Sequence, residues 1–312
     1  MTDTTVPAAG GRRRLAEGLS VTRLGYGVMQ LPGPGVWGPP HDRDAAIAVL
    51  RRVVDLGLTH IDTSDAYGPH VANELIRAAL HPYPAELVVA TKVGVVRDGR
   101  RAFTASTKPA ELREQVERNL RGLGMDALHL VYLRVGGDGL LDPDGVPLAE
   151  SFGALADLRR QGLIRCLGLS GVTRQQLTEA RRTAPVVAVQ NRYHLLDRAS
   201  SDVLAACERH GIAFAAYFPL AAGMLDPRLD RSRLPPGMSV TERQQRTLGE
   251  VAGRHGATWA QAALAWLLAR SPATLAIPGS KSLAHVEENA AATGIALSEI
   301  DLTELDGLVA PV

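Results

Sequence analysis

Three residues that could make up a tuned general acid lie at or just after the ends of two short apolar segments. Residues 60–68 read His-Ile-Asp-Thr-Ser-Asp-Ala-Tyr-Gly, so Asp62 precedes Tyr67 by five positions, and Lys92 lies near the end of the apolar segment 88–94. A lysine in such a segment would be costly as a packing choice. If Asp62 and Lys92 end neighbouring strands they could pair, and the Lys92 charge would lower the pKa of Tyr67 towards that of a useful general acid. The alternative is a structural ion pair beside a capping tyrosine.

Arg134 directly follows the fourth apolar segment, residues 128–133. A guanidinium stays protonated at neutral pH and therefore cannot act as the acid. It could instead donate hydrogen bonds to a substrate oxygen, stabilise negative charge that develops there and attract anionic substrates. His129 lies inside the same segment, five residues earlier. That position predicts a packed histidine rather than a catalyst.

Chemistry at these positions requires elements that bring the ends of separate segments together. Short β-branched segments that are apolar at successive positions indicate parallel strands covered on both faces. Eight such segments are residues 24–31, 58–62, 86–94, 128–133, 163–170, 185–191, 212–218 and 274–279. Helical patterns lie between them, after Gly68 and at residues 44–56, 109–120, 148–160, 173–182, 200–210, 258–270 and 283–291.

Alternating strands and helices predict an α/β protein, with a (β/α)8 TIM barrel as the leading architecture and a doubly wound sheet as the alternative. We expect a short N-terminal hairpin and extra C-terminal helices around the barrel. Residues 1–18 are predicted to be a flexible tail, and residues 19–312 a single barrel domain. The irregular stretch 219–239 follows the seventh strand, on the rim where barrel loops carry function.

The segment 33–38 matches the dinucleotide pattern Gly-x-Gly-x-x-Gly, but its context excludes a Rossmann site. In that motif the last glycine opens a helix whose N-terminus holds pyrophosphate, whereas here two prolines follow. A glycine- and proline-rich loop over a barrel mouth is expected instead. Trp37 at its tip could form a wall of the substrate site or simply pack on the surface, and with Tyr26 and Met29 it completes the predicted substrate contacts.

The composition excludes several classes of protein. The chain has 312 residues, 46% of them hydrophobic, and 34 Lys+Arg against 33 Asp+Glu, which argues against disorder and gives no reason to expect a nucleic-acid partner. No apolar run approaches the ~20 residues that span a bilayer, so no membrane partner is expected. Two cysteines, Cys166 and Cys207, favour the reducing cytoplasm over a disulfide framework. Nine scattered histidines predict no metal site, and no heptad pattern indicates an oligomeric state.

The sequence resembles the aldo-keto reductases from about Leu24 to the C-terminal helix. The motifs that carry the resemblance, in the family's order, are IDTSDAYG, VVATKVG, MDALHLVYLR, LGLSG, AVQN and IPGSKSLAHVEEN. The resemblance implies a TIM barrel that binds NADPH (NADP+) without a Rossmann fold. It also implies that Tyr67 gives a proton to the carbonyl oxygen of a small-molecule substrate. Lys92 and Asp62 would tune Tyr67, and nicotinamide C4 would give a hydride to the carbonyl carbon.

The same resemblance implies a set of cofactor contacts. Those to nicotinamide are Ser170 and Gln190 at its carboxamide and Tyr217 stacked on its ring. Phe218, Pro219 and Leu220 would lie across the pyrophosphate. Gly279, Ser280 and Ser282 would bind phosphate, Lys281 and His285 the 2′-phosphate, and Glu288 and Asn289 the adenine. The chain departs from the family at Arg134, where a histidine is usual, and at Gly171, where an asparagine is usual.

The resemblance extends to a bacterial branch of the family that includes pyridoxal reductases. The 3-hydroxyl of pyridoxal ionises readily beside the aldehyde, and Arg134 could hold the resulting oxyanion. The predicted function is therefore NADPH-dependent reduction of an aldehyde or ketone to an alcohol, with pyridoxal to pyridoxine as the expected reaction. Two alternatives stay open. One is a tailoring reductase of secondary metabolism acting on a keto sugar or polyketide, and the other is an NADPH-binding sensor subunit with little turnover.

Overall fold

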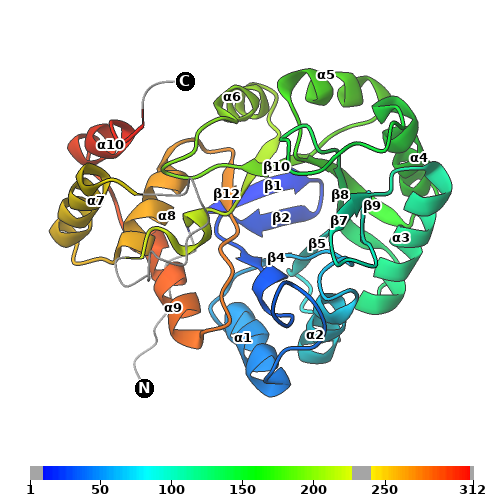
Figure 1. The fold of residues 1–312 in the computed structure, drawn as a ribbon, viewed down its shortest axis with the longest axis horizontal. Helices are drawn as coiled ribbons and strands as arrows, with labels where there is room; N and C mark the ends of the chain where they lie inside the picture. The colour runs from blue at the N-terminus through cyan, green and yellow to red at the C-terminus, as the bar shows by residue number, and fades with distance from the viewer. Residues whose placement is uncertain (1–9, 227–239, 310–312) are drawn as a thin grey trace.

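Eight parallel strands surround the centre of the molecule, which is a computed structural model that describes residues 10–226 and 240–309 (Figure 1). Around the sheet they are β3 (Tyr26–Gly27), β4 (His60–Asp62), β5 (Val88–Val93), β8 (Leu128–Arg134), β9 (Ile164–Ser170), β10 (Ala188–Arg192), β11 (Ala213–Tyr217) and β12 (Thr274–Ala276). The first and last strands meet where Ala276 accepts a hydrogen bond from Gly25 at 2.8 Å and donates one to Arg23 at 2.8 Å. The sheet is therefore a closed barrel.

Helices cover the outside of this barrel (Figure 1). They are α1 (Arg43–Asp55), α2 (Val71–Leu80), α3 (Pro109–Leu123), α4 (Leu148–Arg160), α5 (Arg174–Thr183), α6 (Ser201–Arg209), α8 (Trp259–Ala269) and α9 (Leu283–Ala291). Two further helices, α7 (Glu242–Arg254) and α10 (Glu299–Asp306), lie side by side at the edge of the molecule. The predicted TIM barrel with extra C-terminal helices is confirmed, and the doubly wound alternative is wrong because the sheet closes.

The strands are apolar at successive positions because both of their faces are buried. One set of side chains, including Val88, Leu130 and Leu275, fills the barrel interior. The alternate set, including Val89 and Val131, packs against the helices in a much larger cluster. A packed interior without a pore is the usual state of an eight-stranded barrel of this kind.

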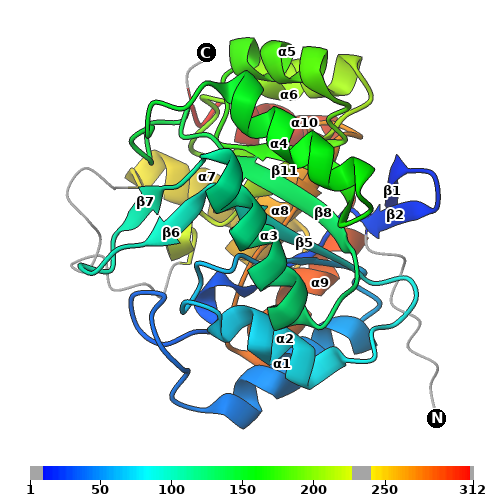
Figure 2. The same ribbon diagram turned by 90° about the vertical axis from the view of Figure 1, so that its right-hand side faces the viewer.

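Hairpins lie at opposite ends of the barrel (Figure 2). β1 (Arg12–Ala16) pairs with β2 (Leu19–Thr22), and its Leu15 joins Leu19 and Val21 in the interior cluster, so the predicted N-terminal hairpin plugs one end. Arg12–Ala16 are consequently a strand and not part of a flexible tail, while residues 1–9 lie outside the described part of the chain. The domain boundary at residue 18 stays a prediction.

Two segments differ from the sequence-based expectation. The strand expected at 24–31 is only Tyr26–Gly27, because a 3-10 helix at Val28–Gln30 takes the chain away from the sheet. The hairpin of β6 (Val95–Arg97) and β7 (Phe103–Ala105), at the end opposite the plug, was not predicted. Residues 33–38 form a loop as expected, and α1 begins only at Arg43. The irregular stretch 219–239 is described only as far as residue 226.

Both cysteines are buried and free. Cys166 on β9 faces the barrel interior, whereas Cys207 on α6 belongs to the outer cluster between helices and sheet. Burial raises the pKa of both thiols, to about 12 for Cys207. Among the described helices, none is both long and apolar enough to cross a bilayer.

Candidate active site

One cleft of about 1200 Å³ opens at the end of the barrel opposite the β1–β2 plug, where the strands have their carboxyl ends. Every residue predicted to act in catalysis or to bind the cofactor lines it. These are Asp62, Tyr67, Lys92, Arg134, Ser170, Gln190, Tyr217, Phe218, Pro219, Leu220, Gly279, Ser280, Lys281, Ser282, His285, Glu288 and Asn289. The barrel thus gathers into one site residues that are up to 227 positions apart in the chain, from Asp62 to Asn289.

Asp62 and Lys92 form a buried ion pair at the base of the cleft. The Nζ atom of Lys92 lies 2.5 Å from Oδ1 of Asp62 and also donates to the carbonyl of Thr63 at 3.0 Å. The other Asp62 oxygen accepts a hydrogen bond from Nε2 of Gln190 at 2.7 Å. Burial alone would lower the pKa of Lys92, but attraction to Asp62 and Tyr67 outweighs it and the pKa is raised. Lys92 therefore stays a cation, 5.1 Å from the centre of the Tyr67 ring.

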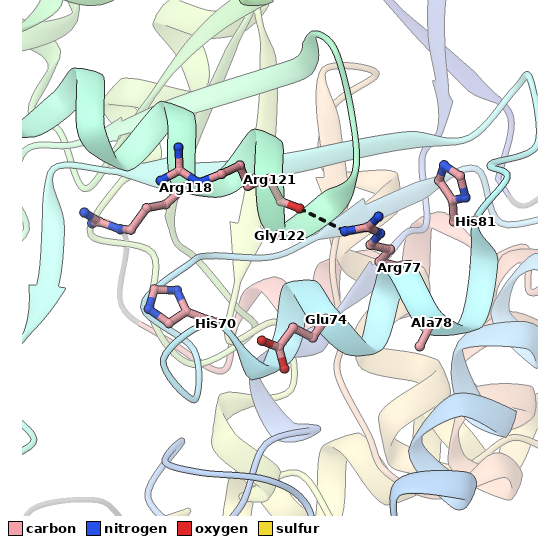
Figure 3. A pocket seen from close by; sticks show the side chains of 8 residues that line it. All are labelled: His70, Glu74, Arg77, Ala78, His81, Arg118, Arg121 and Gly122. Atoms are coloured by element: carbon pink, nitrogen blue, oxygen red, sulfur yellow. Dashed lines mark hydrogen bonds between the residues drawn. The ribbon is translucent and has the colours of Figure 1, made fainter.

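The loop that carries Tyr67 is braced from outside the cleft. Asp65, two residues before Tyr67, accepts hydrogen bonds from Nδ1 of His70 at 2.7 Å and from Nε of Arg118 on α3 at 3.0 Å. Figure 3 shows His70 and Arg118 at the same end of a groove between α2 and α3, in which Arg77 also donates to the carbonyl of Arg121. His70 and Arg118 therefore hold the loop, and Arg77 links the two helices.

Arg134 ends β8, the strand next to β5, and is not isolated. Its Nη1 atom donates to the Ser170 hydroxyl at 3.2 Å, and its Nη2 lies 3.1 Å from Oδ2 of Asp138. The same Asp138 oxygen accepts a hydrogen bond from the Tyr217 hydroxyl at 2.5 Å. Burial raises the pKa of Tyr217, and the bond to Asp138 raises it further against the opposing effect of Arg134. Sequence reasoning singled out Arg134, Ser170 and Tyr217 separately and missed Asp138, which joins them.

Another wall of the cleft is formed by a loop and the start of a helix. Phe218, Ala221 and Ala222 have left-handed backbone conformations, with φ of 52°, 52° and 54°, which non-glycine residues rarely adopt. Such strain concentrates at ligand sites. At the start of α9, Ser282 caps the helix by accepting from the His285 N–H, and Ser280 accepts from the Ser282 N–H.

Gly279 brings this helix start against the first strand. A Cβ atom at residue 279 would lie 2.3 Å from the carbonyl oxygen of Gly27, so only glycine allows this approach. Lys281, the next residue but one, forms no ion pair within residues 10–226 and 240–309. A helix N-terminus with a neighbouring lysine suits a phosphate group.

Of the three predicted substrate contacts, only Met29 lines the cleft. Tyr26 is buried, and its hydroxyl donates to the carbonyl of Ser280 at 2.5 Å, so it supports the α9 loop instead. Trp37 packs outside the cleft, where Arg97 and Arg101 lie 5.3 and 5.2 Å from the centre of its ring. Phe103 takes a place at the mouth that the sequence did not reveal, since it belongs to the unpredicted hairpin, and its ring meets that of Tyr67 edge-on.

Among described residues, no group of three or more His, Cys, Asp or Glu is placed to hold a metal ion.

The family model described as "Aldo/keto reductase family" matches residues 23–310 of the chain. The chain belongs to the aldo/keto reductase family. It is therefore an oxidoreductase, and the resemblance noted from its motifs is confirmed.

Individual aldo/keto reductases can be compared with this one over most of their length. Pyridoxine 4-dehydrogenase of Escherichia coli K12 is 47% identical over 290 residues, which cover 93% of this chain and 95% of that protein. A thermostable aldo-keto reductase solved with the inhibitor epalrestat superposes with a TM-score of 0.79 at 31% identity, covering 96% and 99% of the two chains. An aldo/keto reductase from Klebsiella pneumoniae, solved with NADP and acetate, gives 0.75 at 30% identity, covering 95% and 94%.

Proposed function

We propose that this aldo/keto reductase uses NADPH to reduce pyridoxal to pyridoxine. The reaction class is supported by the buried Lys92–Asp62 pair beside Tyr67 at the base of the cleft. The choice of substrate is carried by the 47% identity, over nearly all of both chains, to pyridoxine 4-dehydrogenase. The two cysteines, both free and buried, are in keeping with a cytoplasmic enzyme.

The residues of the cleft fit a dinucleotide phosphate. A cleft of about 1200 Å³ exceeds the usual volume of a small-molecule site, which leaves room for cofactor and substrate together. Lys281 and the start of α9 would hold phosphate at one end, and Tyr217, Ser170 and Gln190 the nicotinamide at the other. Nicotinamide, when bound there, supplies a hydride to the carbonyl carbon.

Proton delivery falls to Tyr67. As the carbonyl oxygen gains negative charge, the Tyr67 hydroxyl gives it a proton and becomes a phenolate. The adjacent Lys92 ammonium stabilises that phenolate, and it is held in place by Asp62 and the Thr63 carbonyl. Because Asp62 and Lys92 are buried and already paired, they need little rearrangement at the moment of reaction.

Arg134 would meet the oxygen next to the reacting aldehyde. The 3-hydroxyl of pyridoxal is an oxyanion at neutral pH, and a guanidinium offers it charge-assisted hydrogen bonds. Arg134→Met should then reduce kcat/KM for pyridoxal by about tenfold or more. The kcat/KM for benzaldehyde, which lacks that oxygen, should change much less.

The test is NADPH consumption by the purified protein with pyridoxal, benzaldehyde and a keto sugar as separate substrates. We expect kcat/KM for pyridoxal to exceed that for the other two by at least about tenfold. A preference for the keto sugar would instead identify a tailoring reductase. No turnover with any of the three, together with tight NADPH binding, would identify a sensor and overturn the proposal.

A further inference from the structure

Arg134 and Asp138 form an ion pair that is largely withdrawn from water. Their side chains are only 14% and 11% exposed, and the closest contact between them is 3.1 Å. A charge pair of this kind is screened far less than one on the surface. The formal charge that Arg134 presents to the cleft is therefore largely cancelled by Asp138.

Asp138 is fixed in this position by several partners. Its Oδ2 accepts from the Tyr217 hydroxyl at 2.5 Å, and its Oδ1 accepts from the backbone N–H of Leu140 at 3.3 Å. The loop before it is tied to the end of β9, because Val135 donates to the Ser170 carbonyl at 2.9 Å and Gly137 to the Gly171 carbonyl at 2.6 Å. Asp138 is thus held against Arg134 rather than resting there by chance.

Gly171 makes room for the pair. A Cβ atom at residue 171 would lie 2.7 Å from Nη1 of Arg134 and 2.8 Å from Oδ2 of Asp138. The two departures noted in the sequence, at Arg134 and Gly171, therefore belong to one structural change. The Arg134–Asp138 pair fills the space that a side chain at residue 171 would otherwise occupy.

We propose that Asp138 is a specificity-determining residue that neutralises Arg134, so that the site favours net-neutral aldehydes over aldehydes bearing a carboxylate. This inference rests on the proposed carbonyl reduction. The pyridoxal zwitterion carries a phenolate and a pyridinium, and its net charge is zero. Its single ring oxygen can take one or two hydrogen bonds from Arg134 while Asp138 keeps its own. A substrate carboxylate would have to compete with Asp138 for the Arg134 guanidinium. It would also be repelled by the negative charge of Asp138.

The test compares 4-carboxybenzaldehyde with its neutral methyl ester through the ratio of their kcat/KM values. Asp138→Asn keeps the side-chain shape and removes the charge, so we expect this acid-to-ester ratio to rise by about tenfold or more. Asp138→Asn combined with Arg134→Met should lose that gain, because the freed guanidinium is then absent. A loss of Asp138 that merely loosened the fold would lower both values and leave their ratio unchanged.

Asp142→Asn is the matched control, since it removes one negative charge from the same loop at an exposed position. The acid-to-ester ratio of Asp142→Asn should equal that of the wild type. An equal rise of this ratio in Asp142→Asn and Asp138→Asn would overturn the proposal. So would an unchanged ratio in Asp138→Asn, or a wild-type enzyme that already prefers the acid by about tenfold. If none of the proteins reduces either aldehyde, the proposed function fails. Binding of benzoate against methyl benzoate to the NADP+-saturated protein then tests Asp138 by the same comparison.

Discussion

Tyr67 and Lys92 are the residues on which the proposed reaction depends most directly. Tyr67→Phe removes the hydroxyl that would give the proton, so kcat should fall by about 10²- to 10⁴-fold. The Kd for NADPH, measured by fluorescence titration, should stay within about twofold of wild type, because the phenyl ring and its contact with Phe103 remain. A variant that kept more than a tenth of wild-type kcat would rule out Tyr67 as the proton donor.

Gly171 gives a second prediction at the scale of a single residue. Gly171→Ala places a methyl group against Arg134 and Asp138 at a backbone φ of +65°, so the free energy of unfolding should fall by about 1–3 kcal/mol. Urea denaturation measures this. Gly139→Ala is the matched control, since residue 139 also has a positive φ, +72°, and a Cβ there would meet nothing within 4 Å, so its midpoint should fall less. Equal midpoints for the two variants would show that the pair tolerates a side chain at residue 171.

The sequence predicted which residues lie in the cleft better than it predicted their hydrogen-bond partners. Asp62 and Lys92 stand at strand ends, with Tyr67 five residues after Asp62, and a short apolar segment is enough to locate such an end. Asp138 could not be predicted, because its contact with Arg134 depends on the path of a loop and its contact with Tyr217 joins residues 79 positions apart. Tyr26 was assigned to the substrate because its place on the first strand was visible, whereas the direction of its hydroxyl was not.

Between α2 and α3, the groove of Figure 3 links helix packing to the catalytic loop. Asp65→Asn would weaken the bonds from His70 and Arg118, and the loop that carries Tyr67 would lose its outer support. We expect kcat to fall by about tenfold, while the KM for NADPH changes little. Steady-state kinetics with pyridoxal measure both values.

Glu74→Gln controls for the charge of that groove. Glu74 is exposed in the groove, and the hydrogen bonds to Asp65 come from His70 and Arg118. The kcat of Glu74→Gln should therefore match that of the wild type. A similar loss of kcat in Glu74→Gln would mean that the charge of the groove, and not the brace on Asp65, governs the loop.

Elements with a strong apolar pattern were predicted well, and weakly patterned ones were not. The eight barrel strands follow from segments that are apolar on both faces. The β6–β7 hairpin has only partly buried or exposed residues, so no alternation marks it. In α7 the buried residues are Leu248, Val251 and Ala252, too few to stand out within a polar stretch. Tertiary contacts with α10 support that helix instead.

The stability of the whole molecule should depend on pH through one buried histidine, His60. His60 is fully buried, neither of its ring nitrogens has a hydrogen-bond partner among the described residues, and burial lowers its pKa to about 4. In the unfolded chain this pKa is about 6.5. The unfolded state therefore binds the proton first, and stability falls as the pH drops from about 6.5 towards 4. At pH 5 the loss attributable to His60 should be about 2 kcal/mol.

His60→Asn tests this assignment, because asparagine does not titrate in this range. The difference in unfolding free energy between wild type and His60→Asn should shrink by about 2 kcal/mol between pH 7 and pH 5. Urea denaturation at each pH gives the values. A difference that stays constant between pH 7 and pH 5 would contradict the assignment.

The two free thiols lie in separate layers of the fold, so their reactivity can report which layer has opened. A thiol reagent reacts with the thiolate, so a buried cysteine with a raised pKa does not react until water reaches it. Cys207 should become reactive when α6 lifts from the sheet, whereas Cys166 should wait until the strands themselves separate. Labelling followed by mass spectrometry would then time two events in the unaltered chain, the loosening of its shell and the breaking of its barrel.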